Sequence, residues 1–166
     1  GVQTCALPIF FIDDILLGTE SYLPEEVPDI PMDSYEVVPR APTSGPAVWY
    51  KFDGDVADSA GNFPGGLAGG AQIISDSQRG QVLALDGGDW AEFPKIATDW
   101  QAVSFSLWLK LGQVPGQWTA LVTNNGLGDV FFQFDRDVMQ FHLPSVNAVV
   151  SQTSMAELIG KWVHIT

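Results

Sequence analysis

Cysteine and basic residues are both scarce in this sequence. A single cysteine, Cys5, excludes an internal disulfide framework. Seven Lys and Arg residues stand against 20 Asp and Glu residues, so the formal net charge is −13 at pH 7. Such an acidic surface repels the phosphates of nucleic acids and the headgroups of anionic lipids, and we expect neither as a partner. It favours cations, calcium above all, because calcium takes hard oxygen ligands.

The sequence also lacks an apolar run that could cross a membrane. The stretch 6–12 is short, has no basic residue before it and leads directly into Asp13 and Asp14. It resembles neither a membrane-spanning helix nor an export signal, so we expect no membrane insertion. We expect the natural amino terminus, with any export signal, to lie upstream of residue 1.

Catalytic constellations are missing as well. Glycoside hydrolysis needs two carboxylates that flank the scissile bond, whereas Glu92 and Glu157 are isolated. His142 and His164 lie in strand-like patterns, with no neighbouring Ser or Cys nucleophile and no metal-ligand spacing. We therefore predict that the chain is not an enzyme.

What the sequence does contain is the pattern of a β-rich core. It is 46% hydrophobic and 11% aromatic, and its 17 Gly and 11 Pro allow many turns. Apolar and polar residues alternate over 48–52 and 105–111, as in half-buried strands. Many short strands without a long helix predict an all-β, two-sheet antiparallel jelly-roll sandwich from about residue 46. The side chains expected in its core are Val48, Tyr50, Phe52, Leu83, Leu85, Phe105, Leu107, Leu109, Leu121, Phe132 and Phe134.

Two hairpins are expected within this region. Strands at 81–85 and 90–93 flank a loop with two glycines, and glycine accepts the positive φ of a tight turn. Strands at 119–122 and 130–134 are joined through an Asn-Asn-Gly segment. Further strands are expected at 137–143, 146–152 and 161–166.

The chain divides into four segments. Residues 1–9 resemble a translated sequencing-adaptor remnant and are left out of the expected fold. Residues 10–19 have the pattern of one strand. Residues 20–46 combine six prolines with several acidic residues; prolines remove backbone donors and like charges repel, so an extended linker is expected. Residues 47–166 carry the alternating β pattern.

Four stretches of this last segment carry a resemblance to a known family. They are AVWYKFDGDVADSAGN at 47–62, ALDG with WAEF at 84–93, FSLWLK at 105–110 and GKWVHI at 160–165. In this order they resemble the laminin-G-like jelly-roll domains of the concanavalin-A-like lectin/glucanase superfamily. The resemblance implies a non-catalytic adhesion module that binds carbohydrate or protein ligands. It also implies a larger secreted or cell-surface protein with neighbouring domains in the same chain.

Two other functions remain open at this point. The chain could be an accessory or truncated part of a glycoside hydrolase whose acid pair lies beyond Thr166, or it could be a structural spacer domain. Binding of glycans by the domain would separate a binding module from a spacer. Hydrolysis of β-glucan would favour the hydrolase.

The resemblance also bears on the two ends of the chain. The closing strand of such domains is absent downstream of residue 166, which implies a C-terminally truncated domain. FIDDILL at 11–17 resembles that strand. Our interpretation is that residues 10–19 close a preceding β-domain. The alternative is that they fold back beside the strand at 47–53 and take the vacant closing position.

A structural calcium site is expected in the opening loop. Asp53 and Asp58 are the first candidates and Asp55 and Asn62 the second, because Gly54 and Gly61 allow the loop to wrap a cation. If the upstream strand folds back, Asp13 or Asp14 could complete the shell. The alternative is that these groups are solvated turn residues that make local side-chain-to-backbone bonds.

Five of the six tryptophans divide into two groups by their surroundings in the sequence. Trp49, Trp108 and Trp162 lie inside strand patterns and are expected in the core. Trp100 and Trp118 lie in loop-like or edge positions beside Asp99 and Gly116, and they are the candidate ligand-binding residues. Their ring faces could stack on the C–H surface of a pyranose.

Overall fold

The structure is a computed structural model that describes residues 10–18, 46–61, 63–94, 104–123, 131–142 and 149–166. The leader at 1–9 and the expected linker, apart from Pro46, lie outside these residues. The only helix within the described part is a short 3-10 turn, so no helix there is long and apolar enough to cross a membrane. The elements are β1 (Phe10–Gly18), β2 (Val48–Tyr50), β3 (Gly66–Ala68), β4 (Gln72–Asp76), β5 (Gly80–Leu85), β6 (Trp90–Glu92), β7 (Ser104–Leu111), β8 (Gln117–Thr123), β9 (Phe131–Asp135), β10 (Val138–His142), β11 (Val149–Val150), η1 (Met155–Leu158) and β12 (Trp162–Ile165).

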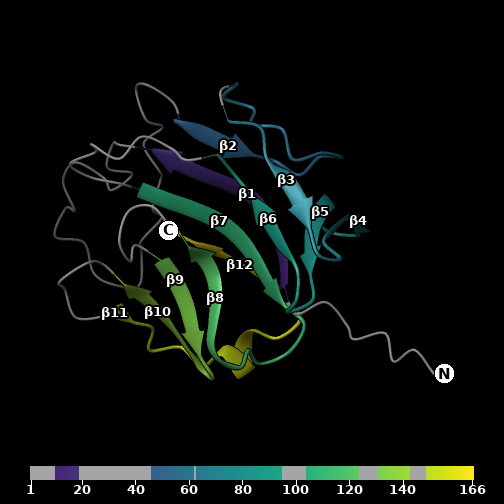
Figure 1. The fold of residues 1–166 in the computed structure, drawn as a ribbon. Helices are drawn as coiled ribbons and strands as arrows, with labels where there is room; N and C mark the ends of the chain where they lie inside the picture. Colours follow the sequence, from purple (N-terminus) through teal and green to yellow (C-terminus); the bar gives the residue numbers. More distant parts are fainter. Residues whose placement is uncertain (1–9, 19–45, 62, 95–103, 124–130, 143–148) are drawn as a thin grey trace, which may run out of the picture.

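These strands form two main antiparallel sheets and one small one. The six-stranded sheet has the order β12-β7-β1-β5-β4, and β2 also pairs with β1. The four-stranded sheet has the order β11-β10-β9-β8, and β3 pairs with β6 by itself. Figure 1 shows β8 to β11 as one layer, with β1, β2, β5 and β7 in another. The predicted all-β antiparallel sandwich is confirmed.

The core lies between the two main sheets, because strand alternation sends every second side chain inward. On β7, Leu107, Leu109 and Leu111 are buried, and the residues between them point to the outer face. Phe134 on β9 is fully buried in the same cluster. Ten of the eleven expected core residues are confirmed: Val48, Tyr50, Phe52, Leu83, Leu85, Leu107, Leu109 and Phe134 are buried, and Phe105 and Leu121 pack against them. Phe132 is half-buried and lies outside this cluster.

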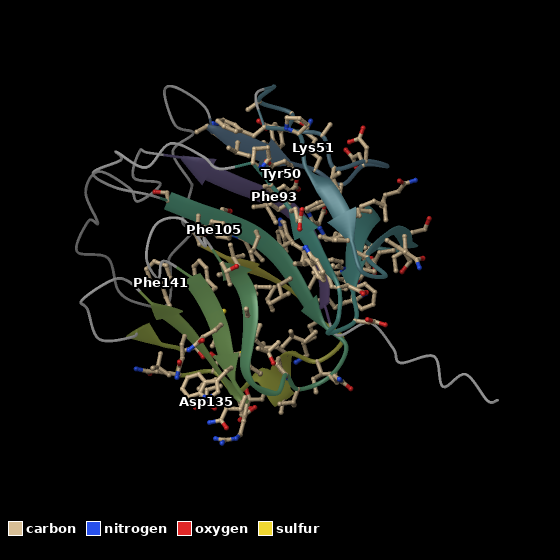
Figure 2. The ribbon with its side chains drawn as sticks, in the orientation of Figure 1. Tyr50, Lys51, Phe93, Phe105, Asp135 and Phe141 are labelled. Atoms are coloured by element: carbon tan, nitrogen blue, oxygen red, sulfur yellow. The ribbon has the colours of Figure 1, made fainter. Side chains whose placement is uncertain are left out.

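Aromatic rings connect the layers. The ring of Phe132 lies 5.3 Å from that of Phe105 on β7 and 4.8 Å from that of Phe141 on β10 (centroid distances). Figure 2 shows Phe105 and Phe141 in the region where β7 approaches β9 and β10. Tyr50 stacks on Phe93 at 3.9 Å, and its hydroxyl donates to the Phe63 carbonyl at 2.6 Å. These contacts hold the chain after β6 and the loop before β3 against the core.

The strand at 10–18 lies inside the six-stranded sheet. Ile15 is paired with Tyr50 on β2, Ile12 with Leu83 on β5, and Ile12 also with Leu109 on β7. Of the two positions considered for this segment, the structure therefore has the fold-back one, beside the strand that begins at Val48. Burial of Ile12 and Ile15 stabilises it there, since each removes apolar surface from water.

One of the two expected hairpins is wrong. β8 and β9 pair antiparallel, as expected. β5 and β6, however, do not pair with each other: β5 lies between β4 and β1, whereas β6 pairs with β3. The loop 86–89 is held to the turn between β3 and β4, because the Asp89 carboxylate accepts a hydrogen bond from the Gly70 backbone N–H at 2.6 Å. The chain thus leaves the six-stranded sheet after Leu85.

Candidate binding site

Trp118 is the most exposed large apolar side chain among the described residues. Its relative exposure is 59%, and it lies on β8, an edge strand of the four-stranded sheet. Gln117 is opposite Asp135 and Thr119 is opposite Phe134, so Trp118 is an extra residue without a partner. Such a bulge turns a side chain out of the regular pleat. The expected edge position of Trp118 is therefore confirmed, whereas Trp100 lies outside the described residues.

The backbone at Trp118 is strained. Its φ is +59°, a left-handed conformation that costs a residue with a bulky side chain about 1–3 kcal/mol. The Thr119 hydroxyl donates a hydrogen bond to the Gly116 carbonyl at 3.0 Å, and this bond braces the segment on both sides of Trp118. The result is an indole held outward on a short, braced segment. A flat, exposed indole can stack on the C–H face of a sugar ring or on an apolar protein side chain.

Trp49, Trp108 and Trp162 do not lie in the core, and that expectation is wrong. All three are half-buried on the outer face of the six-stranded sheet, because they alternate with inward residues such as Val48, Leu109 and Val163. There they contribute to a set of charged and aromatic side chains that we term the outer-face cluster. Its members are Asp13, Asp14, Trp49, Asp76, Arg79, Trp108, Lys110 and Trp162.

Arg79, from the turn between β4 and β5, lies at the centre of this cluster. Its guanidinium stacks over Trp108 at 4.3 Å from the ring centroid. Nε donates to Asp13 at 2.5 Å and Nη2 to Asp14 at 3.1 Å. Asp13 is only 5% exposed, and its burial raises the pKa of its carboxyl even though the Arg79 hydrogen bond lowers it. A buried carboxylate of this kind needs its guanidinium partner.

Asp76, on β4 at one edge of the six-stranded sheet, connects this strand to β7 and to β12 at the other edge. Its carboxylate accepts hydrogen bonds from Lys110 on β7 and from the Trp162 indole N–H on β12, the latter at 3.1 Å. Burial by itself raises the pKa of Asp76, but the hydrogen bonds from Lys110, the Gln78 backbone and Trp162 outweigh it and lower the pKa to about 2. The β4–β5 turn is thereby fastened across the outer face. The three carboxylates and two cations largely neutralise one another.

The ring faces of the cluster are largely taken by cations. Lys51 lies over Trp49 at 4.1 Å, and Lys110 lies 5.2 Å from the centroid of Trp162. Beside Trp162 there is an open depression of about 370 Å³, lined by Gln78, Arg79, Gly160, Lys161 and Trp162. We interpret the cluster as a structural network rather than as a ligand platform, because its charges and rings already have partners.

The opening loop uses its carboxylates differently from the expected calcium shell. Asp58 is 8% exposed, and its carboxylate accepts backbone N–H bonds from Trp49, Ala60 and Phe63 at 2.8, 2.9 and 3.1 Å. Asp55 is exposed and caps the Ala57 N–H, and Asp53 is exposed. Asn62 lies outside the described residues, and Asp13 and Asp14 bind Arg79 as described above.

No described group of three or more His, Cys, Asp and Glu side chains is placed to hold a metal ion. The local bonds of Asp58 are those of the turn alternative. Whether the loop binds calcium stays a prediction.

His164 has a serine neighbour that the sequence analysis missed. Ser106 on β7 lies 2.8 Å from His164 Nε2 on β12, because the two strands pair. Thr166 is 3.4 Å from Nδ1, and the Trp108 ring lies 5.0 Å from the imidazole. A serine triad uses a carboxylate at Nδ1, and within the described residues a threonine stands there instead. The side chain of His142 lies outside the described residues.

A second outward indole was also missed. Trp90 on β6 is 50% exposed, and its indole N–H donates to Glu92 at 2.8 Å. The signal was present in the sequence, because Trp90 and Glu92 are two residues apart on a strand and so share a face. The carboxylate fixes the orientation of the ring.

Comparison of the chain with protein-family models, with curated proteins and with solved structures finds no match. The resemblance to laminin-G-like domains therefore stays a prediction.

Proposed function

We propose that the protein is a non-catalytic binding module for extracellular ligands, and that its ligand is a carbohydrate that stacks on Trp118. The observation that carries the proposal is the exposed indole of Trp118 on a left-handed backbone. Exposure leaves a large apolar surface in water, and the backbone conformation adds a cost of about 1–3 kcal/mol. Neither the exposure of the ring nor the backbone strain stabilises the fold. Both are expected where a ring has to be presented to a ligand.

The resemblance of residues 47–166 to laminin-G-like domains supports the same function. The same resemblance favours a secreted or cell-surface protein with other domains in the same chain. The net charge of −13 supports a neutral or cationic ligand over a polyanionic one.

The test is binding of the full chain to a glycan array, followed by titration of the best neutral oligosaccharide. We expect Trp118→Ala to weaken binding by about tenfold or more, since an aromatic anchor supplies well over 1.4 kcal/mol. Val150→Ala is the matched control. Val150 is 47% exposed and lies on β11, at the other edge of the same sheet.

Four outcomes would contradict the proposal. Equal binding by wild type and Trp118→Ala would remove Trp118 from the site. Binding of protein ligands alone would make the module a protein-binding one. An absence of any binding would favour the spacer, and release of sugar from β-glucan would favour part of a glycoside hydrolase.

A further inference from the structure

β1 joins two parts of the six-stranded sheet that have no other described pairing between them. β7 and β12 lie on one side of it, and β5, β4 and β2 lie on the other. Along β1, residues 10–12 pair with β5 and residues 15–17 pair with β2, while the other edge pairs with β7. Without β1 the sheet would have a gap one strand wide. We term this gap, between β7 and the pair β5 and β2, the β1 slot.

The β1 slot selects its strand by side chain as well as by backbone pairing. On the inner face it buries Ile12 and Ile15, which are 2% and 8% exposed. On the outer face Arg79 binds two successive carboxylates, Asp13 and Asp14, and the Trp49 indole N–H donates to Asp14 at 3.1 Å. A strand that fills the slot therefore needs apolar residues flanking a pair of acids. Only a strand with this pattern satisfies both faces.

The connection between β1 and the rest of the chain is long enough that the slot can be filled by β1 of the same chain or of another copy. The 27 residues 19–45 separate Gly18 from Pro46. Extended at about 3.3 Å per residue, a chain of this length reaches about 90 Å, several times the width of a sheet. A strand on such a connection reaches the slot of its own chain or that of a neighbour, and every contact of β1 described above is the same in both cases.

We propose that β1 is an exchangeable strand and that the β1 slot of one copy accepts β1 from a second copy of the chain. Reciprocal exchange gives a dimer in which each sandwich is completed by its partner. The effective concentration of a strand on its own connection is on the order of millimolar, so exchange is a minority event in dilute solution. It increases where copies are concentrated. This inference is independent of the carbohydrate site at Trp118.

Engineered cysteines in the full chain test the exchange directly. Phe11 and Lys110 face each other in the β1–β7 register, and paired Cα atoms at about 4.5–5.5 Å suit a disulfide. One chain carries Phe11→Cys and a second, differently tagged chain carries Lys110→Cys, both with Cys5→Ser. The two are unfolded together, refolded under oxidising conditions at rising concentrations and separated by mass without reductant.

We expect a cross-linked species of mixed tags at twice the 18.0 kDa of one chain. Its fraction should rise about tenfold for each tenfold rise in concentration while it is small, because dimer formation is second order. The control pair combines Phe11→Cys with Gln117→Cys, since Gln117 is exposed on the other sheet. A chain that carries both Phe11→Cys and Lys110→Cys should form an internal disulfide in dilute solution.

Each result decides the proposal. Mixed dimers well above the level of the Gln117→Cys control support exchange. Mixed dimers at or below that level, with the internal disulfide formed, overturn it. If the internal disulfide does not form either, β1 does not occupy the slot in this register and the proposal fails with it.

Discussion

Arg79 and Asp13, 66 residues apart in the sequence, form an ion pair of 2.5 Å across the outer face of the six-stranded sheet. Asp13 is 5% exposed, whereas the Arg79 side chain keeps 20% of its exposure and lies flat on Trp108. The pair thus fastens β1, the first described strand, to the β4–β5 turn. Loss of the Arg79 cation alone would leave the buried Asp13 carboxylate without a counter-ion, so it should destabilise the protein more than loss of both charges.

Replacement of Arg79 by Met should destabilise the protein strongly. The buried Asp13 carboxylate would lose its counter-ion, and we expect a loss of about 2–3 kcal/mol in the free energy of unfolding. Urea denaturation at pH 7 measures it. The double variant Arg79→Met/Asp13→Asn should recover part of the loss, because no uncompensated charge remains.

Arg136→Met is the control for that prediction. Its pair with Asp135 is 3.4 Å long and its side chain is 64% exposed, so we expect a change below about 0.5 kcal/mol. Equal effects of the two Arg→Met changes would show that burial of Asp13 is unimportant.

Acid should weaken the protein through Asp76. The pKa of Asp76 is about 2 in the folded protein, below its ordinary value of 3.8. A lowered folded pKa contributes stability above the ordinary value, and that contribution disappears as pH falls from about 4 to about 2. Chemical denaturation across this range measures it. Asp76→Asn and Lys110→Met should both be less stable at pH 6 and should both lose less on acidification; an unchanged slope in both would contradict the prediction.

Trp118→Gly should separate stability from binding. Glycine adopts positive φ without the steric cost, so we expect the free energy of unfolding to rise by up to about 1 kcal/mol. Trp90→Gly provides the comparison, because Trp90 is similarly exposed but has no positive φ, and it should destabilise by about 1 kcal/mol. Thermal and urea unfolding of both variants check this. A loss of stability in Trp118→Gly as large as that in Trp90→Gly would show that the backbone there is not strained.

Calcium binding at the opening loop can be separated from local hydrogen bonding. Asp58→Ala should cost about 2–3 kcal/mol even with chelator present, since three backbone N–H groups lose their acceptor. Asp53→Ala should be close to neutral with chelator. With calcium, the melting temperature of wild type should rise and that of Asp53→Ala should not. An equal rise in both would place the ion elsewhere, and no rise in wild type would mean that the loop binds no calcium.

Local sequence pattern predicted the strands and the core well. Alternation over 105–111 identifies the inward leucines of β7, because side-chain direction is set by position along a strand. It identified the pairing of β8 with β9 but not the partners of β5. The two glycines of the 86–89 loop indicated a hairpin, yet Leu85 ends a strand that lies between β4 and β1, while Trp90 begins one beside β3. Pairing depends on contacts between segments that are distant in sequence.

The candidate site was only partly visible for the same reason. Gly116, two residues before Trp118, indicated an irregular edge, and the bulge is there. Trp108 was assigned to the core because it lies inside a strand pattern, although its place between Leu107 and Leu109 already put it on the outer face. The Ser106–His164 pair needed the β7–β12 register, which no local pattern contains.

The bulge at Trp118 has a consequence for self-association. Among the described residues, β8 is one of the two edge strands of the four-stranded sheet, and exposed edge strands invite strands of other molecules. Its register is broken between Gln117 and Thr119 and again between Ala120 and Val122. An incoming strand would meet these breaks within a few residues and could not build the long, flat ladder that fibrils require. The segment that presents the indole therefore also protects this edge from polymerisation.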